Sequence, residues 1–352
     1  MKPVWYDCDP GHDDATAIML AVHCNNICLL GISTVHGNAS ADNTNANAAH
    51  CLYAFGALEN VHVFPGAEKP LIRPTRHDPE IHGLDGLGGV EGLPSADSKG
   101  VRTRLETNGR LVHAIEGMAK AIRDTWNDGK GSKVTVVSSG PLTNIALFAS
   151  VYTELLVGIE EFVFMGGGVG VGNRSASAEF NILCDPEAAQ IVLDVPVKKT
   201  MIPLNVTHTA IVTRDILCEL LAPSVLADAD VLPKASTTLR NMLSTLIGFF
   251  AESYKSTFGF ADGPPLHDAL TIAYVSQPEL FRCKRYRVDV ELSGTHTAGE
   301  TVVDVWEYRC CDDSWGPLGK NCLVAEALNI KGFFKLFLEC VDRCDAVSPL
   351  NH

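Results

Sequence analysis

Short apolar segments alternate with segments of helical periodicity through the first half of the chain. The apolar segments lie at residues 3–6, 27–35, 61–64, 133–140 and 160–168, and the helical patterns at about 15–24, 43–55 and 111–126. Strands separated by helices of roughly 10 to 15 residues are typical of βαβ units, whose strands run parallel. The alternation therefore predicts an α/β chain in which helices flank a central, mostly parallel sheet.

The chain shows no internal repeat, low-complexity tract or linker that would divide its 352 residues, so we expect one domain over 1–352. Two irregular stretches, 65–100 and 166–185, are rich in Gly, Pro, Ser and Asn, and loops of such length in a compact domain are often functional. Beyond residue 304 the sequence becomes Cys-rich. We expect residues 309–352 to pack onto the domain as a strand and helix extension that ends in an amphipathic helix over 329–340.

The composition narrows the class of protein. Asp and Glu outnumber Lys and Arg by 42 to 28, which gives a formal charge of −14 and argues against a nucleic-acid partner, because such proteins present a basic face. No run approaches the roughly 18 apolar residues that span a bilayer, so we expect no membrane partner. Carboxylates follow the first residues directly, which argues against a secretory signal and predicts a cytoplasmic protein. The twelve cysteines are then expected to be reduced and mostly buried thiols.

Acidic side chains crowd the point where the first predicted strand ends and a helix begins. Asp7, Asp9, Asp13 and Asp14 lie within the segment DCDPGHDD. Ligands of open parallel sheets bind at the carboxyl ends of the strands, and hard oxygen donors suit Ca²⁺ or Mg²⁺. One or two of these residues could simply cap the helix. Four carboxylates in such proximity repel one another without a cation, so the segment predicts a metal site.

Other motifs that would place carboxylates or glycines here differ in spacing. An EF-hand loop beginning at Asp7 would need Gly and Glu where the sequence has His12 and Ile18. The segment MGGGVGVGN at 165–173 lacks the dinucleotide fingerprint, and no P-loop occurs. Phosphatases of the haloacid-dehalogenase type also carry Asp-x-Asp after their first strand. A Mg²⁺-dependent phosphohydrolase with Asp7 as its nucleophile therefore stays open, although Gly11 replaces the usual Thr or Val.

Further motifs follow in a fixed order: HGN at 36–38, IHGLDGLGG at 81–89, GPLTNIAL at 140–147, AEFNILCDPEAA at 178–189 and PPLHDAL at 264–270. Together with residues 7–21 they resemble the inosine-uridine preferring nucleoside hydrolases, over about residues 3–308. The resemblance implies a single domain with a Rossmann-like sheet. It also implies Ca²⁺-dependent hydrolysis of the N-glycosidic bond of purine or pyrimidine ribonucleosides, with inosine, guanosine and uridine as candidates, to free base and ribose for nucleobase salvage.

The resemblance assigns roles to individual residues. It implies that the carboxylates of Asp9, Asp14 and Asp268 and the backbone carbonyl of Thr143 hold the Ca²⁺. It implies that a second group, which grips the ribose, consists of Asp13, Asn38, Asn173, Glu179 and Asn181. The resemblance also implies that His267 lies near the leaving base. His82 lies in a Gly-rich loop, where it could close over the base or could be only a surface histidine.

The chemistry of the reaction agrees with these residue types. Cleavage builds positive charge on the ribose ring, which carboxylates and amide oxygens stabilise. Ca²⁺ acidifies a bound water, and Asp9 can accept its proton. A heterocyclic base leaves more readily when protonated, and His267, whose reference pKa is about 6.5, is the expected donor.

Three points stay open at this stage. Tyr254, Phe258 and Phe260 could stack on the base or belong to the core, and the four Trp residues lie outside every motif, so the preferred base is not ranked. A nucleoside or ribose sensor that binds Ca²⁺ without turnover is the rival outside the enzymes. Relatives of this kind are usually oligomers, so a homodimer or homotetramer is expected.

Overall fold

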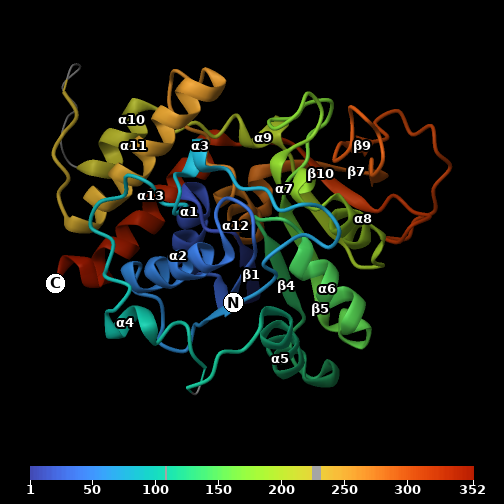
Figure 1. Ribbon diagram of the computed structural model, residues 1–352, viewed down its shortest axis with the longest axis horizontal. Coiled ribbons are helices and arrows are strands. Elements are labelled where there is room, and N and C mark those ends of the chain that lie inside the picture. Colours follow the sequence, from blue (N-terminus) through green and yellow to red (C-terminus); the bar gives the residue numbers. More distant parts are fainter. Residues whose placement is uncertain (108, 224–230) are drawn as a thin grey trace.

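A mostly parallel sheet forms the centre of the molecule. The computed structural model describes residues 1–107, 109–223 and 231–352, and within them the sheet has the strand order β3-β2-β1-β4-β5-β6-β10-β7 (Figure 1). The strands are β1 Lys2–Cys8, β2 Ile27–Thr34, β3 Val63–Pro65, β4 Val134–Ser138, β5 Ile159–Met165, β6 Lys199–Ile202, β7 Phe281–Tyr286 and β10 Cys322–Leu328. Only β7 pairs antiparallel to its neighbour, so the predicted sheet type is confirmed.

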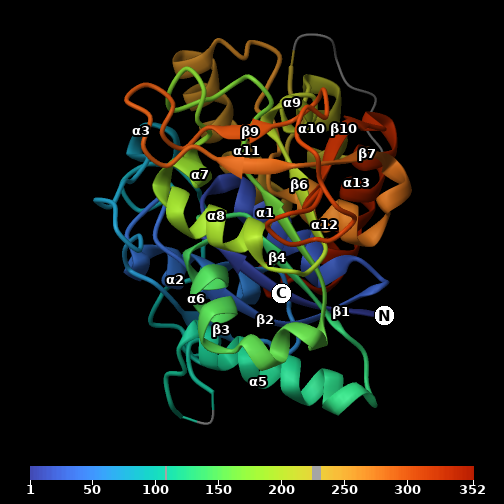
Figure 2. The ribbon, with the colours of Figure 1, turned by 90° about the vertical axis from the view of Figure 1, so that its right-hand side faces the viewer.

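Helices cover both faces of this sheet (Figures 1 and 2). One face packs on α1 His12–His23, α2 Ala41–Ala54, α11 Thr238–Phe258, α12 Ala269–Ser276 and α13 Ile330–Val347, and the other on α5 Ala114–Trp126, α6 Thr143–Val151 and α8 Pro186–Asp194. Successive residues of a strand point to opposite faces. Val4 and Tyr6 therefore belong to the first core and Trp5 to the second. Because both faces are buried, β4 (VTVVS) and most of β5 (IEEFVFM) are apolar at successive positions.

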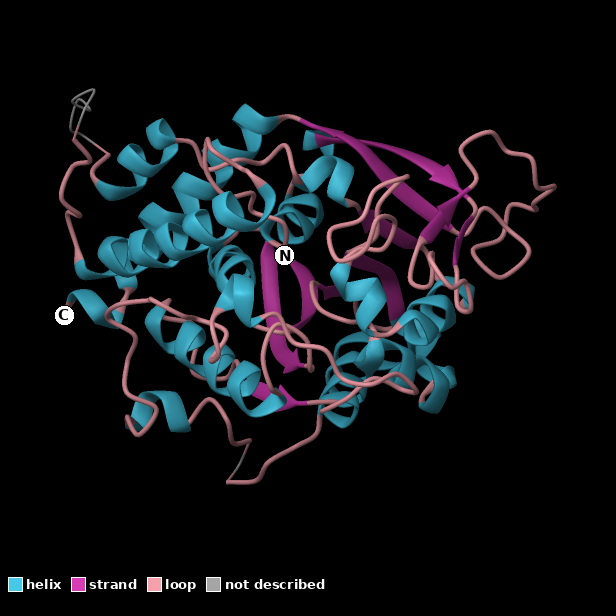
Figure 3. Cartoon of the chain, turned by 45° about the horizontal axis from the view of Figure 1, so that its top comes forward, coloured by secondary structure: helices cyan, strands magenta, loops and turns pink. Residues whose placement is uncertain are grey.

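The remaining elements are short. The helices are α3 Pro79–His82, α4 Lys99–Arg102, α7 Phe180–Cys184, α9 Leu204–Thr207 and α10 Arg214–Leu221, and β8 Val288–Val290 pairs with β9 Thr301–Val303 in a small separate sheet. Figure 3 shows that long loops connect many of the helices and strands. Of the two irregular stretches expected from the sequence, the first contains α3 and ends where α4 begins, and the second contains α7.

Several boundaries differ from those expected. Helix α1 begins at His12 and not near Ala15, because the carboxylate of Asp14 accepts the amide N–H of Gly11 and closes the first turn (3.0 Å). Helix α13 extends beyond residue 340, its expected end, to Val347. Strand β10, from the Cys-rich end of the chain, lies inside the central sheet between β6 and β7.

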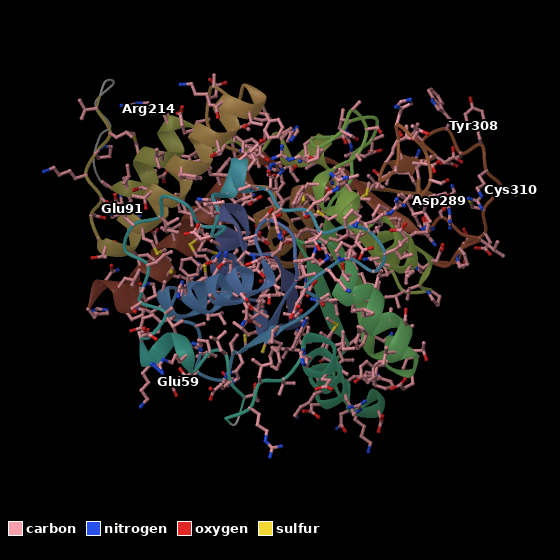
Figure 4. All side chains as sticks on the ribbon, viewed as in Figure 1. Glu59, Glu91, Arg214, Asp289, Tyr308 and Cys310 are labelled. Atoms are coloured by element: carbon pink, nitrogen blue, oxygen red, sulfur yellow. The ribbon has the colours of Figure 1, made fainter. Side chains whose placement is uncertain are left out.

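The cysteines of the C-terminal part have different environments. Cys340 and Cys344 lie on the buried face of α13, whereas Cys310 is exposed on a loop at the edge of the molecule, close to Tyr308 (Figure 4). All twelve cysteines are free thiols. Within the described residues, no helix combines the length and apolar character that crossing a membrane requires.

Candidate active site

The segment DCDPGHDD near the start of the chain and the His267-Asp268 pair meet at the carboxyl edge of the sheet. Helix α1 packs against α12, which brings the starts of both helices together. Asp13, Asp14 and Asp268 each offer a carboxylate oxygen, and these oxygens lie within 4.8 Å of one another. All three side chains are buried. The predicted convergence of residues separated by more than two hundred positions in sequence is therefore present in the fold.

Asp9 lies in the same buried region, directly after β1. Its Oδ2 accepts the amide N–H of Asn38 at 2.7 Å, and its Oδ1 has no hydrogen-bond partner in the described part of the chain. Glycines enclose it, since a Cβ atom would lie 1.9 Å from Oδ2 at Gly37 and 2.6 Å from Oδ1 at Gly140. A buried carboxylate oxygen without a partner costs free energy, and a cation would supply that partner.

Burial and mutual repulsion raise the pKa values of these carboxylates. Burial, followed by the charge of Asp14, raises the pKa of Asp9 well above its usual value. Burial raises the pKa of Asp14 to about 6 and that of Asp13 to about 8, and burial together with Asp13 and Asp14 raises the pKa of Asp268 strongly. The four groups cannot all ionise without a positive charge among them. Their oxygens are the hard donors that Ca²⁺ and Mg²⁺ prefer.

A small pocket that opens to solvent lies above this cluster. Its lining is mostly polar, which suits a polar ligand. The pocket is lined by eight residues that the sequence predicted, namely Asp13, Asn38, His82, Asn173, Glu179, Asn181, His267 and Asp268. Predicted site residues from six separate segments of the sequence thus face one pocket.

Hydrogen bonds to neighbouring residues fix the amide and carboxylate side chains of this pocket. Asn38 donates from Nδ2 to Asp14 Oδ2 at 3.1 Å, and Asn181 donates from Nδ2 to the carbonyl of Ser139 at 2.7 Å. The carboxylate of Glu179 accepts the amide N–H groups of Gly167, Asn181 and Ile182. Burial nevertheless raises the pKa of Glu179 to about 7.

Aromatic and histidine side chains form the opposite wall. The hydroxyl of Tyr254 lies 2.6 Å from Nε2 of His267, whose Nδ1 lies 2.7 Å from the hydroxyl of Thr207. Burial lowers the pKa of His267 well below its usual value, so the ring is neutral. Tyr254 and Phe258 line the pocket, whereas Phe260 packs on Tyr254 and His208 behind them.

Comparison with known proteins decides what this arrangement is. The family described as inosine-uridine preferring nucleoside hydrolase matches residues 4–335. The chain belongs to this family. A probable ribonucleoside hydrolase from Dictyostelium discoideum is 38% identical over 98% of this chain and 95% of its own length. A uridine nucleosidase from Saccharomyces cerevisiae is 33% identical over 99% of this chain and 98% of its own length.

A solved structure agrees with the sequence relatives. The purine-preferring ribonucleoside hydrolase from Gardnerella vaginalis superposes with a TM-score of 0.82 and 25% identity, over 99% of this chain and 100% of that one. The chain is therefore a nucleoside hydrolase, an enzyme that acts on N-glycosyl bonds of ribonucleosides. The expected single α/β domain is that of this family.

The phosphohydrolase interpretation of Asp7 fails in this nucleoside hydrolase. Asp7 is fully buried inside the sheet, where its Oδ1 accepts the hydroxyl of Ser33 and the amide of Asn144 at 2.5 and 2.8 Å. Asp7 does not line the pocket. Burial raises its pKa to about 7, so much of it is protonated at neutral pH and a poor nucleophile.

Thr143, expected to offer its carbonyl to a metal, is not brought to the carboxylate cluster. It is the first residue of α6, and helical carbonyls point along the axis toward the C-terminal end. Its hydroxyl donates to Asp185 at 2.7 Å and contacts His36 Nε2 at 3.0 Å. Ser139, immediately before the GPLTN motif, lines the pocket instead and donates to Asp14 Oδ1 at 2.5 Å.

Sequence reasoning missed three polar residues of the nucleoside hydrolase pocket, Ser139, Asp78 and Arg174. The position of Ser139 at the end of a predicted strand was an available signal. Asp78 and Arg174 lie in the two long irregular stretches and pair across 96 positions, which no local pattern reveals. His12 is buried, and its backbone N–H donates to His82 Nδ1 at 3.2 Å.

Proposed function

We propose that this enzyme hydrolyses ribonucleosides with a bound Ca²⁺ held by the carboxylates of Asp9, Asp14 and Asp268. The observation that carries the proposal is the unpartnered Oδ1 of Asp9 beside three further buried carboxylates, below a pocket of polar side chains. When bound, the ion would orient the sugar hydroxyls and acidify a water molecule. The proposed set contains no ligand from Thr143.

Different residues of the pocket would then accept the proton of water and bind the ribose. Asp9 Oδ1 would accept the proton of the attacking water, because it is the one oxygen of that carboxylate without a hydrogen bond in the described residues. Asn38, Asn181 and Glu179 would grip the ribose together with Asp13 and Asn173. Their backbone and side-chain partners hold them before substrate arrives, which favours catalysis because no reorganisation is then needed.

The leaving base would lie against the histidine and aromatic wall. A base that departs needs a proton or a compensating positive charge. The hydroxyl of Tyr254 would give its proton to the departing base and become a tyrosinate that the Nε2–H of neutral His267 stabilises, while the hydroxyl of Thr207 donates to Nδ1 of the ring. Solvent would return a proton to Tyr254 before the next turnover. His82, on the same wall, would contact the base without carrying charge, since burial lowers its pKa well below the usual value.

Names of relatives suggest two kinds of base. The yeast relative is called a uridine nucleosidase, and the bacterial structure is called purine-preferring. The pocket offers no Trp side chain for a stacked purine. We propose uridine and inosine as substrates of this chain, with guanosine as a third, and salvage of the released base as the use of the product.

A reducing-sugar assay tests the proposal. Inosine, guanosine, adenosine, uridine and cytidine are each assayed with the enzyme as purified, after a strong chelator, and after Ca²⁺ or Mg²⁺ is returned. We expect ribose release that the chelator abolishes and Ca²⁺ restores. Tight inosine binding without ribose release would support the sensor, and restoration by Mg²⁺ alone would contradict the proposed metal.

The location and the assembly are proposals of the same kind. A cytoplasmic enzyme is consistent with twelve free thiols, since reducing compartments preserve them. A homodimer or homotetramer remains the expected state, and light scattering of the purified protein tests it directly. A monomer at micromolar concentration would contradict that expectation.

A further inference from the structure

The pocket carries one permanent positive charge. Its lining includes the carboxylates of Asp13, Asp78, Glu179 and Asp268, and its two histidines have pKa values that burial lowers well below the usual range. Arg174 is the only Lys or Arg side chain among the described residues that line it. Its side chain is 19% exposed, so the guanidinium is largely withdrawn from solvent.

Arg174 is held in a defined position. Its Nε donates to Asp78 Oδ2 at 3.0 Å, and its Nη2 contacts both oxygens of the same carboxylate. The guanidinium carbon lies 5.3 Å from the centre of the Phe258 ring, a cation–π contact. Nη1 makes no hydrogen bond within the described residues, and its nearest carboxylate, that of exposed Glu80, is 4.0 Å away. Arg174 thus keeps free donor capacity while its orientation is fixed.

The pair joins the two walls of the pocket. The backbone N–H of Asp78 donates to the carbonyl of Asn38 at 3.1 Å, and the carbonyl of Asp78 accepts the N–H of His82 at 3.0 Å. Arg174 follows Asn173 in the other long loop. Phe258, Tyr254 and Ile81 form the apolar part of the lining, so Arg174 lies on the side where a heterocyclic base can pack rather than with the metal-site carboxylates.

We propose that Arg174 is a specificity-determining residue that selects nucleobases with a carbonyl oxygen at C4 of a pyrimidine or C6 of a purine over those with an amino group at that position. A guanidinium has five N–H donors and no acceptor. It can therefore pair with O4 of uracil and with O6 of hypoxanthine and guanine, whereas the amino groups at C4 of cytosine and C6 of adenine would face it as competing donors. As the base leaves, electron density moves onto those carbonyl oxygens, and the fixed charge stabilises it. This inference rests on the proposed function.

Steady-state kinetics of Arg174→Met and Arg174→Lys test the proposal. The readouts are the ratios of kcat/KM for uridine against cytidine and for inosine against adenosine. We expect the wild-type enzyme to favour uridine and inosine, and Arg174→Met to reduce both ratios by about tenfold or more, as loss of a charged hydrogen bond would. Arg174→Lys keeps the positive charge but lacks the planar guanidinium with its parallel N–H donors. It should therefore retain the preference for uridine and inosine, with a higher KM.

Arg73→Met is the matched control. Arg73 also pairs with a carboxylate across two segments, that of Glu187, but it lies outside the pocket, so its loss should leave both ratios unchanged. Ratios that stay the same in Arg174→Met while the overall rate falls would overturn the specificity role and leave only a structural one. A wild-type enzyme that cleaves cytidine and adenosine as fast as uridine and inosine would also overturn it. A wild-type enzyme that cleaves no nucleoside would instead refute the proposed function.

Discussion

The hydroxyl of Tyr254 lies 2.6 Å from Nε2 of His267, and both side chains are buried at the wall of the pocket. The other ring nitrogen of His267 is engaged by Thr207, and burial lowers the pKa of the ring. His267 is therefore no free imidazolium that could protonate a base by itself. Its contribution depends on the tyrosine in front of it.

This relationship predicts that Tyr254 and His267 matter only for leaving groups that need a proton. Tyr254→Phe and His267→Ala should each reduce kcat for inosine by about 100-fold, within the range of general acid catalysis. Both should affect p-nitrophenyl riboside by much less, because p-nitrophenolate leaves without a proton. Stopped-assay kinetics on the two substrates measure the difference.

Tyr152→Phe provides the matched control, because Tyr152 packs with the second core and not in the pocket. It should leave both substrates unaffected. Equal losses on inosine and p-nitrophenyl riboside in Tyr254→Phe or His267→Ala would rule out proton delivery and indicate a disturbed pocket.

The carboxylate cluster predicts a coupled loss of metal and activity. Asp14→Ala should bind little Ca²⁺ and lose at least about 1,000-fold in kcat, because it removes a proposed ligand and the partner of Ser139 and Asn38. Metal analysis by mass spectrometry, together with the ribose assay, measures both. Asp7→Asn is the control: Asp7 points to Ser33 and Asn144, so this variant should keep its metal. A full metal complement in Asp14→Ala would contradict the assignment.

The sheet and much of the site were predictable because they depend on local patterns. Apolar segments bounded by helices predicted the strands up to β5, and eight predicted residues line one pocket. Strand β6 has only four residues and begins with a lysine, so no apolar run marked it. The insertion of β10 and the pairing of Asp78 with Arg174 are long-range contacts. Thr143 was wrongly expected at the metal because its motif was matched without the direction of its carbonyl.

The raised pKa values of the pocket carboxylates predict that the metal-free protein loses stability as the pH rises above neutral. Folding raises the pKa of Asp14 to about 6, of Glu179 to about 7 and of Asp13 to about 8. Burial lowers the pKa of His12, His36, His82 and His267, so below about pH 7 these histidines bind fewer protons in the folded state than in the unfolded chain and oppose the carboxylates. Above about pH 7 the histidines are neutral in both states, the raised carboxylates dominate, and the free energy of unfolding falls. The Tm of chelator-treated enzyme should drop from pH 7 to pH 8, and added Ca²⁺ should restore most at pH 8.

Thermal unfolding with and without Ca²⁺ at each pH measures this effect. Asp14→Asn serves as its internal control, because it removes one titrating group and should flatten the pH dependence of the metal-free protein. A Tm that rises between pH 7 and pH 8 in the chelator-treated enzyme would contradict the interpretation of a repulsive carboxylate cluster.

The ion pairs of Arg240 are expected to stabilise the packing of the C-terminal helix α13. Its buried guanidinium pairs with Asp345 at 2.8 Å and Asp342 at 2.6 Å and donates to the carbonyl of Leu220, so it joins α11, α13 and α10. Arg240→Met should lower the free energy of unfolding by about 3 kcal/mol, because it leaves a largely buried Asp345 without its cation. Arg282→Met is the comparison, since Arg282 is 73% exposed in its pair with Glu326 and should cost less than about 1 kcal/mol. Urea denaturation of the Ca²⁺-loaded proteins measures both, and similar losses in the two variants would show that burial of the Arg240 cluster contributes nothing.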